Sequence, residues 1–219
     1  MTDTTQAPFT LRDGLNVALY DWPLPMRRRP RGVVLIVHGL GEHAWRYDAV
    51  ARRLNDWGFV VRAYDQRGHG DSGGAQGTLP EDDTLVEDLD EVLDDTRRHI
   101  AEPWACPLIL FGHSMGASIA WAVAEQLWFI HQCRPVLIVS AQSPTPEKQL
   151  AEQTQYDLPG WFELLGEKFP AALKHPELRA LFETTWASDS QWMKRELACF
   201  HPSVLPVDVH AMYGIRDGL

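Results

Sequence analysis

The sequence predicts an α/β fold, in which helices cover both faces of a doubly wound, mostly parallel sheet. Apolar runs alternate with helical patterns along the first 140 residues, an order typical of parallel strands joined by right-handed crossovers. Residues 33–37 are five consecutive apolar residues, four of them β-branched, as a strand buried on both faces requires. A glycine-flanked serine follows another apolar run and indicates a sharp turn between a strand and a helix.

Local sequence patterns predict the individual strands and helices. The polar residues 1–8 are expected to be disordered, and the alternation in residues 10–21 predicts two strands around the Asp13-Gly14 turn. Residues 45–58 predict an amphipathic helix ending at Gly58, with a buried face of Tyr47, Val50, Ala51, Leu54 and Trp57. The remaining patterns predict strands at 33–37, 59–64, 108–111, 135–140 and 207–213, and helices at 82–100 and 117–128.

Composition restricts the partners and the compartment. The 219 residues carry a formal net charge of −10, which argues against nucleic acid because its phosphates would be repelled. Three widely separated cysteines lack metal or redox spacing, so we expect reduced thiols in a cytoplasmic protein. The polar N-terminus does not look like a signal peptide, and no apolar stretch approaches the length of an integral membrane segment.

The strongest functional signal is the sequence Gly112-His113-Ser114-Met115-Gly116. A G-x-S-x-G turn between a strand and a helix is a nucleophile elbow, in which the serine hydroxyl stands clear of the sheet at a helix N-terminus. Only small residues fit beside such a turn. We therefore predict that Ser114 is a catalytic nucleophile. The competing interpretation is a glycine-rich turn with an incidental serine.

Two glycine-containing loops follow the preceding strands. Residues 38–43, His-Gly-Leu-Gly-Glu-His, can turn sharply and direct a backbone N–H toward an oxyanion, and they do not match a dinucleotide fingerprint. Residues 65–74 form a second loop, for which we favour a structural role with Asp65 paired to Arg67. We interpret His69 in the same way.

The second half of the chain departs from the strand–helix rhythm. We assign residues 1–142 to the core with the elbow, residues 143–200 to a helical lid insertion, and residues 201–219 to a returning core strand. The insertion favours an acyl chain because it is rich in large apolar side chains. Its candidate substrate-contacting residues are Trp161, Phe162, Leu165 and Phe182. The alternative is that these are ordinary crossover helices whose aromatic residues are core.

The last predicted strand ends in Gly214-Ile215-Arg216-Asp217. A carboxylate just beyond the carboxyl end of a strand lies at the edge of the sheet where a triad acid belongs. Asp217 is therefore the candidate acid.

Residues 9–117 resemble the monoacylglycerol lipase group of the α/β-hydrolase superfamily. The resemblance rests on the segments 38–43, 65–72 and 112–116. It implies that Ser114 is the nucleophile and that the backbone N–H groups of Leu40 and Met115 form the oxyanion hole. It implies no metal or organic cofactor.

Residues beyond 117 are similar to type II thioesterases, which serve polyketide and nonribosomal peptide synthases. This resemblance rests on residues 111–117, Val139-Ser140 with its proline-rich sequel, residues 158–182 and the Gly-x-x-Asp at 214–217. It implies Asp217 as the triad acid and an acyl carrier protein as a possible partner. The chain thus resembles two families that share the elbow.

In both families a histidine follows the acid, yet no histidine follows Asp217 in these residues, and a C-terminal strand and helix are expected to be missing. His210 lies inside a predicted strand, below the active edge, and is a poor substitute. Three hypotheses follow. The first is a lipase-like hydrolase of carboxylic esters, the second an acyl thioesterase, and the third a truncated or non-catalytic fragment that binds acyl groups.

Overall fold

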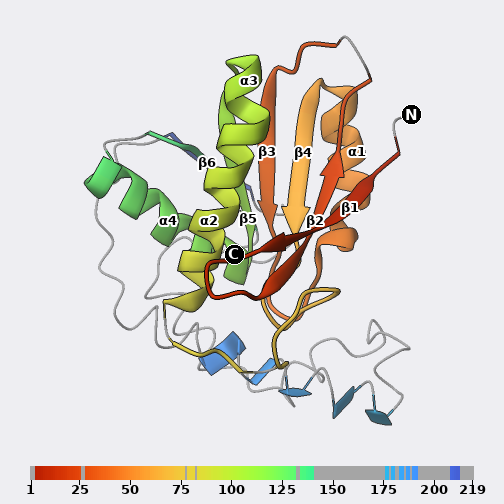
Figure 1. The fold of residues 1–219 in the computed structure, drawn as a ribbon, viewed down its shortest axis with the longest axis vertical. Helices are drawn as coiled ribbons and strands as arrows, with labels where there is room; N and C mark the ends of the chain where they lie inside the picture. The colour runs from red at the N-terminus through yellow and green to blue at the C-terminus, as the bar shows by residue number, and fades with distance from the viewer. Residues whose placement is uncertain are drawn as a thin grey trace.

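The structure is a computed structural model that describes residues 3–25, 28–76, 78–81, 83–131, 134–140 and 208–212, and parts of 176–191. Its described strands form one seven-stranded sheet in the order β1-β2-β4-β3-β5-β6-β7 (Figure 1). The strands are β1 (Thr5–Thr10), β2 (Asn16–Trp22), β3 (Gly32–Val37), β4 (Phe59–Tyr64), β5 (Leu108–His113), β6 (Val136–Ser140) and β7 (Val209–Met212).

The sheet is parallel from β4 to β7, and β1 and β2 extend it as an antiparallel hairpin. This confirms the predicted mostly parallel sheet and the strand pair around the Asp13-Gly14 turn. The expectation of disorder across residues 1–8 is wrong from Thr5 onward. Gln6 pairs with Tyr20 in the hairpin register, and its side-chain amide donates to Asp71 Oδ2 at 2.9 Å.

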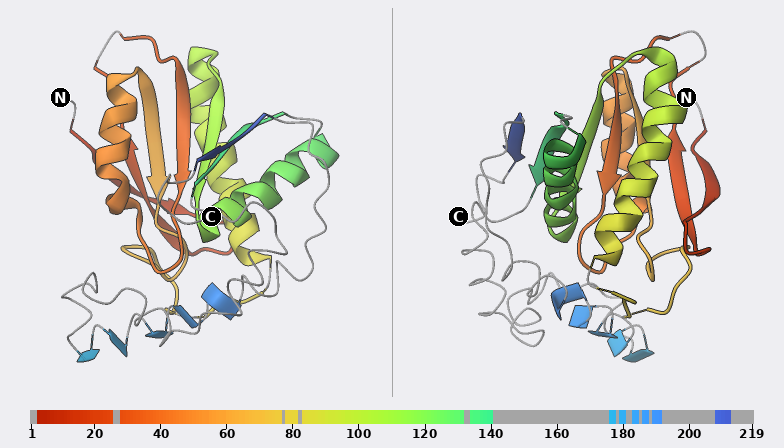
Figure 2. Two further views of the ribbon diagram at one scale, coloured as in Figure 1. Left: turned by 180° about the vertical axis from the view of Figure 1, so that it is seen from behind. Right: turned by 60° about the vertical axis from the view of Figure 1, so that its left-hand side comes forward.

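Helices lie on both faces of the sheet, as the doubly wound fold requires (Figure 2). Val34 and Ile36 of β3 pack toward α1, whereas their neighbours Leu35 and Val37 belong to the cluster with α2 and α4. The strand is therefore buried on both faces. The helical elements are η1 (Ala44–Tyr47), α1 (Asp48–Asp56), α2 (Thr84–Thr96), η2 (Arg97–Ala101), α3 (Glu102–Trp104) and α4 (Met115–His131).

The predicted apolar face of the first helix is partly wrong. Tyr47 and Ala51 are buried, but Val50 is 41% and Trp57 is 51% exposed. The first turn, η1, is a 3₁₀ helix, which has about three residues per turn, so the buried face is not in phase with a continuous α-helix. The α-helix ends at Asp56, and Trp57 stacks under the Arg53 guanidinium at the surface.

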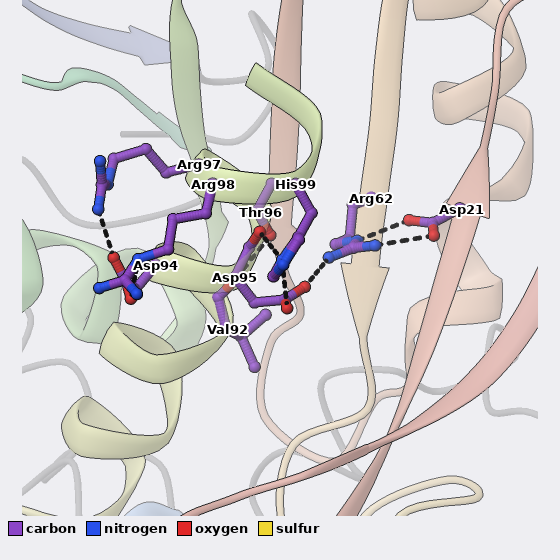
Figure 3. Close-up of polar contacts among 9 residues, drawn as sticks. All are labelled: Asp21, Arg62, Val92, Asp94, Asp95, Thr96, Arg97, Arg98 and His99. Carbon is purple, nitrogen blue, oxygen red and sulfur yellow. Dashed lines mark hydrogen bonds and ion pairs between the residues drawn. The ribbon is translucent and has the colours of Figure 1, made fainter. Parts of the chain in front are cut away.

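A buried arginine aligns α2 with the sheet (Figure 3). Arg62 of β4 donates to both oxygens of Asp21 in β2, at 2.6 and 2.9 Å, and to Asp95 of α2 at 2.5 Å. His99, in the π-helical turn η2 after α2, pairs with Asp95 at 2.8 Å. The two ion pairs of Arg62 therefore tie one helix to two strands.

The described residues between 176 and 191 are helical and lie beyond the carboxyl ends of β3 and β4 (Figure 1, blue). Trp161, Phe162, Leu165 and Phe182, predicted for the lid, and Asp217 lie outside the described residues. Within the described part of the chain, no helix combines the length and apolar character needed to span a bilayer.

Candidate active site

Ser114 occupies the turn between β5 and α4 in a left-handed backbone conformation, with φ of 51°. Its N–H donates to the Ser140 carbonyl at the end of β6, at 2.9 Å, and its own carbonyl accepts from Ala117 N–H at 2.9 Å. A left-handed conformation is costly for a serine and is kept only where its surroundings impose it. The strand, strained turn and helix predicted from the sequence are thus present.

The two flanking glycines are required by close backbone contact. A Cβ on Gly116 would lie 2.3 Å from the Val37 carbonyl oxygen, and a Cβ on Gly112 would lie 2.5 Å from Ala117 Cα. Real Cβ atoms do not approach so closely. The first turn of α4 can therefore pack on the end of β3 only with glycine at position 116, and on β5 only with glycine at position 112, which confirms the steric reason for the motif.

The loop of residues 38–42, which we call the oxyanion loop, lies beside this turn. Gly39 N–H donates to Glu42 Oε2 and Gly41 N–H donates to Asp189 Oδ2, each at 3.1 Å. The N–H groups of Leu40 and Met115, the two predicted oxyanion donors, meet no acceptor among the described residues. Leu40 N–H is thus the unpaired amide between two paired ones.

Glu42 has further partners that hold it in place. Its Oε2 accepts from Tyr47 OH at 2.6 Å, and its Oε1 lies 3.3 Å from Arg46. Burial, followed by the hydrogen bond from Tyr47 to Glu42, raises the pKa of the Tyr47 hydroxyl. Tyr47 therefore stays protonated and donates to Glu42 at neutral pH.

His38 is a neutral, structural histidine at the start of the oxyanion loop. Its Nε2 accepts the Gln66 N–H at 2.9 Å, so its proton resides on Nδ1, which donates to the Gly39 carbonyl at 2.9 Å. Burial, with the nearby positive charge of His69, lowers the pKa of His38 well below its ordinary value. Its ring is fully engaged and is unsuited to proton transfer.

His69 and Asp189 form a buried ion pair. His69 Nε2 lies 3.0 Å from Asp189 Oδ2, and Nδ1 lies 3.0 Å from the Arg67 carbonyl, so both ring nitrogens face acceptors. Burial alone would lower the His69 pKa, but the hydrogen bond and charge of Asp189 outweigh it and raise the pKa. Sequence reasoning missed Asp189, because nothing in the local pattern distinguishes it from other acidic residues near it.

The loop after β4 has the structural role predicted for it, but with different partners. Arg67 does not pair with Asp65; it binds Asp88 of α2 and Asp13. The Asp65 carboxylate instead accepts the N–H groups of Ala44 and Asp71, at 2.6 and 2.8 Å. Asp65 thereby joins two loops at the carboxyl edge of the sheet, while Arg67 points to α2.

No described imidazole contacts the Ser114 hydroxyl. His113 Nδ1 lies 3.5 Å from Ser140 Oγ, and burial lowers the pKa of its ring. His210 lies within β7, in register with Ile138 of β6, as predicted. The described residues also contain no group of three or more His, Cys, Asp or Glu side chains arranged to hold a metal ion.

The sequence is similar to known hydrolases. A family model described as serine aminopeptidase, S33, matches residues 28–199. The monoacylglycerol lipase of Mycolicibacterium smegmatis is 42% identical over 97 residues, which are 42% of this chain and 32% of that protein. The matched part of the chain spans about a third of the length of this relative and of the mouse monoglyceride lipase.

Solved structures share the fold over nearly the whole chain. A soluble variant of monoglyceride lipase from Saccharomyces cerevisiae, in complex with a substrate analog, has a TM-score of 0.61 at 18% identity, covering 98% of this chain and 87% of that one. A thioesterase domain from the curacin biosynthetic pathway has a TM-score of 0.58 at 20% identity, covering 98% and 84%. These likenesses show the α/β-hydrolase fold.

Proposed function

We propose that this chain, which belongs to the serine aminopeptidase S33 family, is a serine hydrolase that cleaves carboxylic esters of acyl chains through an acyl-enzyme. One observation carries the proposal. Ser114 is held in a left-handed turn at the N-terminus of α4, and the Leu40 and Met115 N–H groups beside it lack acceptors among the described residues. A nucleophile with two unpaired amides nearby is suited to acyl transfer.

The reaction proceeds in two steps. Ser114 Oγ attacks the ester carbonyl carbon as its proton passes to a general base, and the carbonyl electron pair moves onto the oxygen. The Leu40 and Met115 N–H groups stabilise this oxyanion. The bond to the alcohol then breaks, the alcohol leaves with the proton, and water releases the acid and Ser114 by the same route.

The base in this scheme is an imidazole oriented by Asp217. Asp217 would hold the tautomer of that imidazole and stabilise its positive charge. Support for Asp217 comes from its sequence position alone, because it lies outside the described residues. His38 and His69 do not serve as the base, since both ring nitrogens of each are hydrogen bonded.

The substrate is proposed to be a monoacylglycerol or a similar acyl ester, with residues 143–200 acting as a lid. Relatives described as monoacylglycerol lipases support the ester, and the contact of Asp189 with Gly41 supports an insertion that covers the site. Trp161, Phe162, Leu165 and Phe182 would then contact the acyl chain. A cytoplasmic location stays a prediction.

The second candidate is an acyl thioesterase that accepts acyl groups from a carrier protein. The likeness of fold to a thioesterase domain favours it. The same nucleophile and oxyanion donors serve both reactions, because only the leaving group differs: a thiol replaces the alcohol. The comparison of substrates below separates the two candidates.

The test is labelling with a fluorophosphonate, which phosphonylates activated serines, followed by measurement of the intact mass. We expect one adduct on the wild-type chain and none on Ser114→Ala. Ser118→Ala, one turn further along α4, is the matched control and should label like the wild type. A folded wild-type chain without an adduct would contradict catalysis and leave the hypothesis of an acyl-binding fragment.

Turnover then identifies the substrate class. Initial rates are compared for a monoacylglycerol, for a 4-nitrophenyl ester and for the N-acetylcysteamine thioester of the same acyl chain. A higher kcat/KM on the monoacylglycerol supports the lipase-like reaction. A higher kcat/KM on the thioester overturns it in favour of the thioesterase, for which an acyl carrier protein becomes the next substrate to test.

A further inference from the structure

We propose that Asp189 is a positioning residue for the oxyanion loop: its carboxylate holds the Gly41 N–H and so leaves the Leu40 N–H directed at the reacting oxygen. The inference rests on the proposed function, since it concerns the same site. It adds a residue that lies 148 positions beyond Gly41 in the chain.

The hydrogen bonds of the oxyanion loop leave one N–H group without an acceptor among the described residues. Three consecutive amides, of Gly39, Leu40 and Gly41, could each donate to an oxyanion. Glu42 Oε2 occupies the first and Asp189 Oδ2 the third, each at 3.1 Å. Among the residues that the structure describes, only the middle amide has no acceptor, so the two carboxylates select which N–H the loop presents.

The backbone of the oxyanion loop makes a tight turn at Gly41. Gly41 has a φ of 63°, a left-handed conformation, so the chain reverses direction immediately after Leu40. The Glu42 N–H donates back to the Gly39 carbonyl at 3.3 Å and closes the turn on one side. The bond from Gly41 to Asp189 fixes the other side. Without it, the peptide between Leu40 and Gly41 has no described partner on its N–H.

The carboxylates of Asp189 and Glu42 each lie beside a basic side chain. An unpaired carboxylate near an oxyanion hole would oppose the negative charge that develops there. Asp189 is only 3% exposed and is paired with His69, and Glu42 lies 3.3 Å from Arg46. Asp65 and the His38 ring, whose centroid lies 5.1 Å from that of His69, also face the pair. Each carboxylate can therefore orient an amide without adding net negative charge.

A purely structural ion pair is the competing explanation. His69 and Asp189 would then only fasten residues 189–191 to the loop after β4, and the bond to Gly41 would be incidental. A structural role predicts that removal of Asp189 lowers stability and leaves kcat per folded molecule unchanged. A positioning role predicts a loss in kcat and a local change at Gly41.

The first readout is independent of catalysis. In the ¹⁵N-labelled 219-residue chain, the Gly41 amide is followed by NMR in wild type, Asp189→Ala and Asp189→Asn. We expect hydrogen exchange at Gly41 to rise by about tenfold in Asp189→Ala, the order expected for loss of one charge-assisted hydrogen bond. Gly39, held by Glu42, serves as the internal reference and should change little.

The second readout is steady-state turnover of the 4-nitrophenyl ester. Loss of an oxyanion donor costs about 10²–10³ in kcat, so a misaligned donor in Asp189→Ala should cost about 10- to 100-fold, with KM changed by less than about threefold. Asp189→Asn keeps an oxygen that can accept from Gly41 and should recover part of the rate. Glu87→Ala, which removes an exposed carboxylate of α2, is the control and should retain full activity.

The outcomes distinguish the two proposals. If the wild type is inactive and unlabelled but Gly41 responds to Asp189→Ala, the hydrolase assignment fails and the positioning of the loop stands. If the wild type is active and kcat per folded molecule survives in Asp189→Ala, the inference is overturned, whatever Gly41 does. A loss of kcat with an unchanged Gly41 amide also overturns it. If Asp189→Ala does not fold, Asp189→Asn decides by a smaller effect, because a neutral amide oxygen accepts a weaker hydrogen bond than a carboxylate. Faster exchange at Gly41 together with a partial loss of kcat supports the inference, and wild-type values of both overturn it.

Discussion

Arg67 donates two parallel hydrogen bonds to Asp88, from Nε to Oδ2 at 2.9 Å and from Nη2 to Oδ1 at 2.7 Å. Its third nitrogen lies 2.7 Å from Asp13. Both Arg67 and Asp88 are buried, so the pair connects the loop after β4 to α2 in a setting with little solvent. The hairpin turn, the loop and the helix are thereby held by one side chain.

Removing this arginine should be strongly destabilising. Arg67→Met leaves Asp88 buried without its cation, and the loss of one partner of a buried pair costs about 3–5 kcal/mol. Urea unfolding at pH 7 measures the change in the free energy of unfolding. Arg98→Met is the control, because Arg98 pairs with Asp94 at the surface and should contribute less than about 1 kcal/mol (Figure 3). Equal losses in the two variants would contradict the importance of burial.

A methyl group on Gly116 should disrupt the elbow. The added Cβ would lie 2.3 Å from the Val37 carbonyl oxygen, so β3 and α4 must separate. We expect Gly116→Ala to lower the free energy of unfolding by about 3 kcal/mol or more and to abolish fluorophosphonate labelling. Gly14→Ala is the control for backbone strain, since its Cβ meets nothing within 4 Å and its φ is 86°. A labelled Gly116→Ala chain of wild-type stability would refute the close contact.

Ala105 offers a stabilising substitution. It caps α3 in a left-handed conformation, with φ of 47° and ψ of 50°, which glycine adopts without strain. Ala105→Gly should raise the free energy of unfolding by about 0.5–1 kcal/mol, and hence Tm by about 1–4 °C. Ala101→Gly, at a buried helical position four residues earlier, should instead lower Tm. Calorimetry on the two variants checks the opposite signs.

Acid should destabilise the fold through His38. Its pKa is lowered well below the ordinary value, chiefly by burial, so the unfolded chain binds a proton below a pH of about 6.5 while the native ring stays neutral. His38 therefore stabilises the fold above that pH, and the contribution falls by up to about 1.4 kcal/mol per pH unit as pH drops. His69, with a raised pKa, acts in the opposite direction and loses its contribution as pH rises.

The measurement is urea unfolding of the wild type and His38→Gln at pH 7.5, 6.5 and 5.5. The difference between the two proteins should shrink as pH falls below about 6.5, because only the wild type carries the buried neutral imidazole. A difference that grows toward acid pH would show that His38 is protonated in the native state.

The parallel sheet was predictable because its signals are local. The apolar residues Val33–Val37 predict a strand buried on both faces. The glycines at 112 and 116 predict a tight turn with no room for a side chain at either position. Contacts between distant residues were not predictable. Arg67 was expected to bind its neighbour Asp65, but the side-chain directions set by the loop send it to Asp88.

The same limit applies to the site. Ser114 was predicted from the G-x-S-x-G motif, and the structure shows it in a left-handed turn between β5 and α4. Its catalytic role, and the oxyanion roles that the resemblance implies for Leu40 and Met115, stay predictions. Asp189 belongs to no motif, and only the folded chain brings it to Gly41 and His69. The exposure of Trp57 was missed for a different reason, since a 3₁₀ turn at the start of a helix leaves no clear mark in the periodicity of apolar residues.

The hydrogen bond from Ser114 to Ser140 has a consequence for biosynthesis. The Ser114 turn is held by the ends of three strands, at Val37 of β3, His113 of β5 and Ser140 of β6, so it depends on pairings between residues far apart in the sequence. Such non-local pairings form late in folding because loop closure must precede them. In a nascent chain emerging from the ribosome, the Ser114 turn therefore cannot take its final conformation until β6 has emerged and joined the sheet.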